Sequence, residues 1–183
     1  NYVFDAKGNL MAAAGINPKT YAVEIYIYTK NLPAEYFSGS ACSVRADDCI
    51  VVIGEGSQKI KNKNWTFWKT TSWDEELRLV SYDKESNSLI TVENVDHDLS
   101  GVYRTNFRTG DRKLIYRHDV VDIDAVLTDD ESKVYGATLM DGYHTLIFFK
   151  GENETKDRIK KLKSLFPGST ISPSAESDDS TKS

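Results

Sequence analysis

Proline, cysteine and long hydrophobic runs are all scarce in this sequence. Its 183 residues include only four prolines, beside ten tyrosines, seven phenylalanines and three tryptophans, and this balance favours strands, because aromatic side chains pack well on pleated surfaces. The longest apolar runs, such as Ile50 to Ile53 and Thr145 to Phe149, are far shorter than the roughly 20 residues that a membrane-spanning helix needs. Two cysteines without a neighbouring histidine argue against a metal site. We therefore expect an all-β protein without a membrane segment.

An excess of charge of one sign is also missing. The formal net charge of −5 arises from acidic and basic residues that are mixed along the chain, which is typical of a solvated surface and argues against a nucleic-acid partner. No initiator methionine or leader precedes the first strand pattern, and residues 171–183 are mostly polar. We expect the chain to be part of a longer protein.

The two cysteines leave the cellular compartment open. Cys42 and Cys49 enclose six residues, a spacing that allows a hairpin-like loop to close through a disulfide. Such a bond would indicate a periplasmic or secreted protein, because disulfides persist in oxidising compartments. Two ordinary thiols flanking a strand are the alternative, and they would suit the cytoplasm.

A hairpin pattern recurs three times along the chain. Each copy has an apolar strand, a turn rich in Asp, Asn, Gly or Ser, and a second apolar strand, and these turn residues tolerate tight backbone geometry. A strand rich in Tyr or Phe follows each hairpin. The hairpins and the strands that follow them are residues 2–14 with 21–28, 79–93 with 101–107, and 126–139 with 143–149.

Fourth strands are predicted at Arg112–Tyr116 and at Asn64–Lys69, and four antiparallel strands per unit are typical of a β-propeller blade. Asp129 follows Asp83 at the spacing of blade repeats, roughly 40–50 residues. The interval from Asp5 to Asp83 is much longer. An inserted hairpin or loop at 32–60 accounts for the difference.

Residues 154–166 interrupt the strand pattern. Apolar residues recur there at helical spacing. Asn153 precedes the segment as a cap, and Pro167-Gly168 follows as a stop. This pattern predicts a short amphipathic helix inserted in the third unit.

Together these patterns predict an all-β fold, a partial β-propeller of about three four-stranded antiparallel blades with one short helix near 154–166. Because so few blades do not close a ring, we expect either self-association through open blade edges or an open, curved arrangement of the sheets. The predicted units are a blade at 1–75 with the cysteine-bearing insertion at 32–60, a blade at 76–118, a blade at 119–170 with the inserted helix, and the truncated start of a further blade at 171–183.

Several of these features occur in a characteristic order: Phe4-Asp5 with Gly8-Asn9, the Trp65 strand, Leu114 to His118 leading into Val121 to Asp124, the Asp129-Asp130 turn, and Leu165 to Gly168 after the helix. In this order the chain, from about residue 2 to 180, resembles the N-terminal propeller of the prolyl oligopeptidase family of serine peptidases. The similarity is to its bacterial dipeptidyl-peptidase-like and acylaminoacyl-peptidase-like members.

The resemblance implies a non-catalytic part of a larger hydrolase. In the family, the propeller sits over a C-terminal α/β-hydrolase domain that carries the Ser, Asp and His, and it gates the access of peptide substrates. A nucleophile elbow needs Gly-x-Ser-x-Gly, and this sequence has no such motif. We therefore expect no catalytic, cofactor-binding or metal-binding residues in this chain, and a parent protein that cleaves short peptides. The alternative is a propeller module that binds a protein or polysaccharide and has no hydrolase attached.

Two groups of polar residues invite a functional interpretation. Asp122 and Asp124 flank Ile123 and would face the same side of a strand, where a pair of carboxylates suits a cation. Because buried polar groups are usually satisfied, we predict instead that both bond to backbone amides of the neighbouring blade. The histidines fall at different blade positions, and we interpret them as surface or turn residues: His97, His118 and His144.

The three tryptophans lie close together in the sequence, at Trp65, Trp68 and Trp73. An aromatic cluster can bind a sugar or a peptide side chain. Large aromatic residues between blades more often belong to the core, because each removes roughly 150–250 Å² from water. We predict that these belong to the core.

Overall fold

Antiparallel strands build the first of two units, Asn1–Phe149, and a helix lies in the second, Lys150–Ser183. This description rests on a computed structural model. The residues that the structure describes are 1–31, 37–38, 50–53, 56–59, 65–72, 74–106, 109–129, 131–151, 153–169 and 171.

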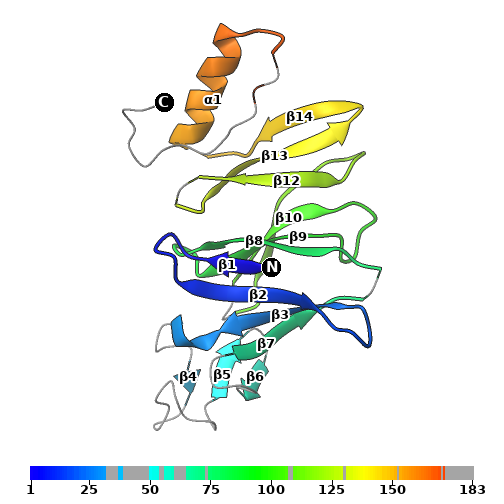
Figure 1. Ribbon diagram of the computed structural model, residues 1–183, viewed down its shortest axis with the longest axis vertical. Coiled ribbons are helices and arrows are strands. Elements are labelled where there is room, and N and C mark those ends of the chain that lie inside the picture. The colour runs from blue at the N-terminus through cyan, green and yellow to red at the C-terminus, as the bar shows by residue number, and fades with distance from the viewer. Residues whose placement is uncertain are drawn as a thin grey trace. The chain divides into compact units, whose positions relative to one another are not determined.

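The first sheet has the strand order β1-β2-β3-β7 (Figure 1). Its strands are β1 (Tyr2–Phe4), β2 (Leu10–Ile16), β3 (Val23–Tyr28) and β7 (Trp65–Thr70). A 3-10 turn, η1 (Thr29–Asn31), follows β3. The fourth strand thus lies where the sequence predicted it.

The described part of the insertion between β3 and β7 contains a small sheet of its own, where the sequence predicted a hairpin or a loop. Its strands pair in the order β4-β5-β6. They are β4 (Phe37–Ser38), β5 (Ile50–Ile53) and β6 (Gly56–Lys59). Cys42 and Cys49 lie outside the described residues, so both interpretations of the pair stay open.

The second sheet is a continuous antiparallel meander in the order β11-β10-β9-β8. Its strands are β8 (Leu77–Asp83), β9 (Ser88–Glu93), β10 (Gly101–Asn106) and β11 (Arg112–Arg117). The third sheet has β12 (Ile123–Thr128), β13 (Val134–Asp141) and β14 (Tyr143–Phe148) in that order. In the described part of the chain this sheet has three strands, where a blade was expected to have four.

The three predicted hairpin turns share one local mechanism. In each, an aspartate Oδ1 accepts a hydrogen bond from the backbone N–H two residues later, at 2.9 Å for Asp5, 3.0 Å for Asp83 and 3.1 Å for Asp129. This Asx geometry offers the backbone a turn in place of a continued strand. In the first turn, Gly8 supplies the positive φ of 78°.

Two apolar cores hold the three sheets face to face. The first joins residues of the first and second sheets, and the second joins residues of the second and third sheets. Strand β9 is buried at every position and contributes Leu89 to one core and Ile90 to the other. Successive side chains of a strand point to opposite faces, so the second sheet is the middle layer of the stack.

The second unit contains α1 (Glu154–Leu165), which confirms the predicted helix. The Asn153 side chain caps it by accepting a hydrogen bond of 3.0 Å from the Lys156 N–H. The Phe166 N–H donates to the Leu162 carbonyl at 3.0 Å. Among the described residues, no helix has the length and apolar character to cross a membrane.

Candidate functional site

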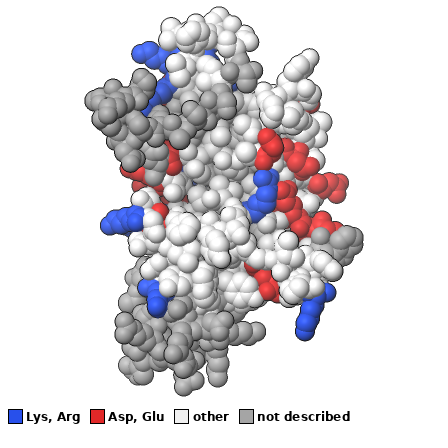
Figure 2. Space-filling model, in the orientation of Figure 1, with Lys and Arg blue, Asp and Glu red and all other residues white. Residues whose placement is uncertain are grey.

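An open pocket of about 670 Å³ lies where the second and third sheets meet. Three acidic residues, one arginine and several apolar residues line it, from β8, β12, β13 and the segments just before β8, β10 and β12. In Figure 2, acidic side chains gather beside a basic one on one flank of the visible face. The lining residues are Glu76, Arg78, Leu99, Val120, Val121, Asp122, Ile123, Asp124 and Met140.

Arg78 links the second and third sheets at this pocket through hydrogen bonds. From β8, its guanidinium donates to the carbonyl oxygens of Ile123 at 2.6 Å and Asp124 at 2.9 Å, both on β12. Its Nε donates to Glu76 Oε1 at 2.5 Å. Because a guanidinium is a planar fork of donors, these three bonds fix its orientation at the pocket wall.

A second tie between the sheets uses Ser100 and Asp122. The Asp122 carboxylate accepts a hydrogen bond of 2.7 Å from the Ser100 N–H, and the Ser100 hydroxyl oxygen accepts one of 3.0 Å from the Ile123 N–H. Ser100 is fully buried, so these two bonds satisfy its N–H and hydroxyl groups, which have no access to water. The predicted bond from Asp122 to an amide of the neighbouring blade is confirmed.

The same prediction was wrong for Asp124. Its carboxylate accepts a hydrogen bond of 3.2 Å from the Thr138 hydroxyl, within its own sheet. Asp122 precedes β12, and the pairing of β12 with β13 shifts register between Ile123 and Ala125. Both residues line the same pocket, but Asp122 bonds to the second sheet and Asp124 to its own.

The pocket combines charged side chains with apolar surface. Three carboxylates face a single guanidinium, and that guanidinium is already bound. Apolar surface lies beside them, since Val120 is 68% exposed and Met140 is 52% exposed. An amphipathic ligand with a positive charge complements this lining.

A buried carboxylate, which the sequence analysis missed, joins the first and second sheets. Glu93 at the end of β9 has a side chain only 1% exposed, and its Oε2 lies 2.5 Å from Lys69 Nζ on β7 and 3.3 Å from Arg112 on β11. The Thr91 hydroxyl donates to its other oxygen at 2.7 Å. The available signal was a charged residue closing an otherwise uncharged strand. We name Glu93, Lys69, Arg112 and Thr91 the Glu93 cluster.

The three histidines lie in three different segments, between β9 and β10, after β11, and on β14. His97 Nδ1 accepts from the Leu99 N–H at 3.0 Å, and His118 Nδ1 accepts from the Val120 N–H at 3.2 Å, so both stabilise turns. His144 is exposed on β14. Within the described residues, no group of three or more His, Cys, Asp or Glu side chains is placed to hold a metal ion.

The described tryptophans are partly buried. Trp68 packs against the core between the first and second sheets, as predicted. The Trp65 ring meets the Tyr28 ring edge to face, with centroids 4.9 Å apart. Trp73 lies outside the described residues.

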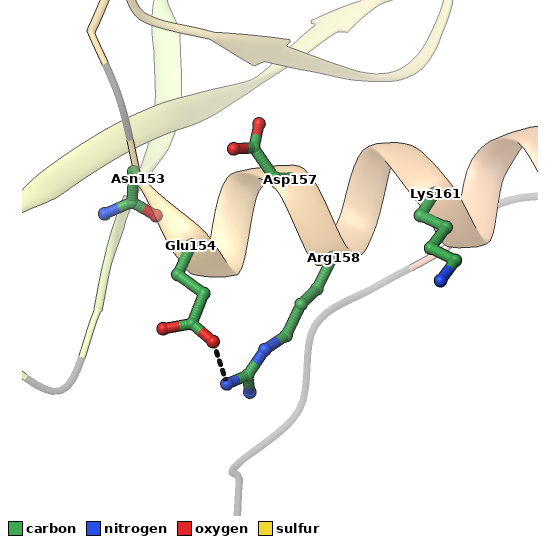
Figure 3. Close-up of a pocket in the computed structure, with 5 residues that line it drawn as sticks. All are labelled: Asn153, Glu154, Asp157, Arg158 and Lys161. Carbon is green, nitrogen blue, oxygen red and sulfur yellow. Dashed lines mark hydrogen bonds and ion pairs between the residues drawn. The ribbon is translucent and has the colours of Figure 1, made fainter.

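A second pocket, of about 540 Å³, lies along α1 in the second unit. All five of its lining residues are polar: Asn153, Glu154, Asp157, Arg158 and Lys161 (Figure 3). Glu154 and Arg158 form an ion pair of 2.7 Å on the exposed helix surface. Exposed ion pairs of this kind contribute little to stability.

Shifted pKa values occur away from the first pocket. The hydrogen bond to Glu24, together with burial, raises the pKa of Tyr26. Burial and the nearby Asp119 charge raise the pKa of Tyr116. Hydrogen bonds to Glu131 and Glu85 raise the pKa of Lys133. None of these three groups lines the pocket, so we attribute their shifted pKa values to contacts elsewhere in the structure.

No protein-family model, curated protein or solved structure matches this chain.

Proposed function

We propose that this chain is a non-catalytic propeller segment that scaffolds and gates the active site of a serine peptidase acting on short peptides. The peptidase part of the proposal rests on the resemblance of its ordered motifs to the prolyl oligopeptidase family. The scaffold part rests on the stacked antiparallel sheets. The α/β-hydrolase domain of the parent protein and a peptide substrate would be its partners.

The observation that carries the scaffold role is an aromatic row on the first sheet. Tyr2 pairs with Ala13, Ala13 with Tyr26, and Tyr26 with Phe67, so the row crosses all four strands. The Tyr26 and Phe67 rings meet edge to face at 5.9 Å. The residues next to Tyr26 in β3, Ile25 and Ile27, belong to the core shared with the second sheet. By strand alternation the row faces away from that core.

Such a row on the outer face of an end sheet is suited to packing against a further layer. Tyr2 is 63% exposed and Phe4 on the same strand is 49% exposed, and large exposed apolar patches mark interaction surfaces. A propeller with more blades, or a domain lying over these blades, would cover the row. This is the surface that a segment of a larger assembly would present.

The test compares this chain with the full-length gene product. Both are assayed for cleavage of aminoacyl and dipeptidyl chromogenic substrates, with and without a fluorophosphonate, which labels activated serines. The proposal expects cleavage and labelling by the full-length product and neither by this chain. A full-length product that neither cleaves nor is labelled would refute the peptidase role.

A separate variant tests the aromatic row. Tyr2→Glu should leave the stability of this chain nearly unchanged, because Tyr2 is exposed here. In the full-length product it should lower stability by about 1–3 kcal/mol, because a charge would be buried without a partner. Equal effects in the two proteins would show that nothing covers the row.

A stand-alone binding module is the second candidate, and the open pocket between the second and third sheets favours it. Its carboxylates and apolar wall would suit a basic segment of a partner protein. A gene product without a hydrolase sequence, with binding that is lost on Asp124→Asn, would support this candidate over the first.

A further inference from the structure

The third sheet ends in a strand that lacks the protection found on the outer strands of the other two. In the first sheet, the outer strand β7 carries Lys69. In the second sheet, the outer strand β11 carries three cationic residues in the sequence Arg112-Lys113-Leu114-Ile115-Tyr116-Arg117. Both pair with their neighbours through a register shift. Charged side chains and bulges are the usual devices that keep sheet edges from pairing with other chains.

Strand β14 has neither device. Its sequence, Tyr143-His144-Thr145-Leu146-Ile147-Phe148, contains no Lys, Arg, Asp or Glu, although 28% of the chain is charged. It pairs with β13 without any register shift. In the described part of the chain, β14 is the last strand of its sheet (Figure 1).

The backbone groups that face outward from β14 can be assigned from one bond. The Phe149 N–H donates to the Tyr135 carbonyl at 2.9 Å. In an antiparallel ladder, alternate residues point their N–H and C=O groups to the same side. Ile147 and Thr145 therefore point toward β13, and Leu146 and His144 point away from it.

This outward edge is open over its first half. Tyr143 is 84% exposed, and His144 and Thr145 are also exposed. An exposed row of N–H and C=O groups on an uncharged strand is a template for another strand.

We propose that β14 pairs with β14 of a second copy of this chain, antiparallel and about a two-fold axis at Thr145. In this register, His144 of each copy exchanges two backbone hydrogen bonds with Leu146 of the other. Tyr143 of each copy lies opposite Ile147 of the other, and an aromatic residue opposite a β-branched one is a favourable cross-strand pair.

A second copy of this chain suits β14 as a partner, because the antiparallel register is self-complementary. A two-fold interface places the same patch on both subunits, and an uncharged strand meets its own copy without repulsion. This inference does not depend on the proposed peptidase role. It concerns an edge of the third sheet, whereas that role rests on the outer face of the first.

The test uses the position on the two-fold axis. There Thr145 faces itself, with Cβ atoms about 4.5–5.5 Å apart in a cross-strand pair. Thr145→Lys or Thr145→Glu should therefore place two like charges in direct opposition and weaken dimerisation by about fivefold or more. Mixing the Lys and Glu variants should restore a dimer, because opposite charges then meet.

The measurement is sedimentation velocity over a dilution series of the 183-residue chain at low salt. Thr128→Lys is the matched control, since Thr128 is an exposed threonine on β12 of the same sheet, and it should leave the dimer unchanged. Thermal unfolding checks that each variant is folded.

Three results would overturn the proposal. They are a monomeric unsubstituted chain at every concentration, an equal effect of Thr145→Lys and Thr128→Lys, or no recovery in the mixture of Lys and Glu variants. Pairing with a strand of another protein would give the first of these results.

Discussion

Removing the ammonium of Lys69 tests how strongly the Glu93 cluster joins the first two sheets. Lys69 Nζ lies 2.5 Å from Glu93 Oε2, and the side chains are 26% and 1% exposed. Lys69→Met keeps most of the length of the side chain and deletes its charge. The buried Glu93 carboxylate would then depend on Arg112 at 3.3 Å and on the Thr91 hydroxyl.

The expected cost follows from the burial of the anion. Deleting one partner of a buried ion pair typically costs about 3–5 kcal/mol, because it leaves a charge uncompensated. Two partners of Glu93 remain, and Lys69 is partly exposed, so we expect the lower end, about 3 kcal/mol. For a chain of this size that loss lowers the midpoint of thermal unfolding by roughly 6–12 °C.

The assay is thermal unfolding followed by tryptophan fluorescence, because Trp68 packs against the core beside this cluster. Lys133→Met is the matched control. Lys133 contacts Glu85 and Glu131 at 3.0 Å, but both carboxylates are exposed, so we expect no measurable change in the midpoint.

A double variant sharpens the test. Lys69→Met with Glu93→Gln removes both charges of the pair, and it should be less destabilised than Lys69→Met alone. Equal midpoints for Lys69→Met and Lys133→Met, or a double variant no better than the single one, would refute the reasoning that a buried anion makes this contact important.

Two further predictions concern single residues. Burial acts to raise the pKa of Asp5, but hydrogen bonds from Asn9 and Lys7 outweigh it and lower that pKa below 3.8. The ionised Asp5 carboxylate therefore contributes its full stabilisation at pH values above the pKa of the unfolded chain, and this contribution is lost as the pH falls through the pKa of the folded chain. Titration of the carboxyl group followed by NMR should find a midpoint below 3.8. A midpoint at the ordinary value would contradict this. Gly136→Ala places a Cβ 2.4 Å from the Ile147 carbonyl oxygen, so we expect a loss of about 1–3 kcal/mol. Gly15→Ala, with open space around it, is the control, and equal unfolding midpoints for the two variants would count against the predicted clash.

The strands and the helix could be predicted because their causes are local. Each hairpin turn rests on an aspartate that bonds a backbone N–H two residues away, and the helix begins at the Asn153 cap. Both interactions lie within a few residues of sequence. Periodicity and turn chemistry therefore indicated them without knowledge of the rest of the fold.

The contacts between sheets could not be predicted in the same way. Lys69 and Glu93 belong to different sheets, and they meet because β9 is buried on both faces. Arg78 bonds carbonyls some 45 residues away. Carbonyl groups are present at every residue, so nothing in the sequence singles out Ile123 and Asp124 as acceptors. The prediction for Asp124 was wrong for a related reason: its partner, Thr138, lies on the paired strand β13, and the alternation of side chains does not show which residue of β13 lies beside Asp124.

The ties between the second and third sheets also bear on the proposed gating role. Arg78 and Asp122 both line the pocket and join the sheets. A cationic ligand that bound Glu76 would compete with Arg78 for that carboxylate. A ligand can shift a structure only by the difference in its affinity for two arrangements, and this competition supplies such a difference. Occupancy of the pocket and the spacing of the two sheets would therefore be coupled, with the same coupling free energy acting in both directions.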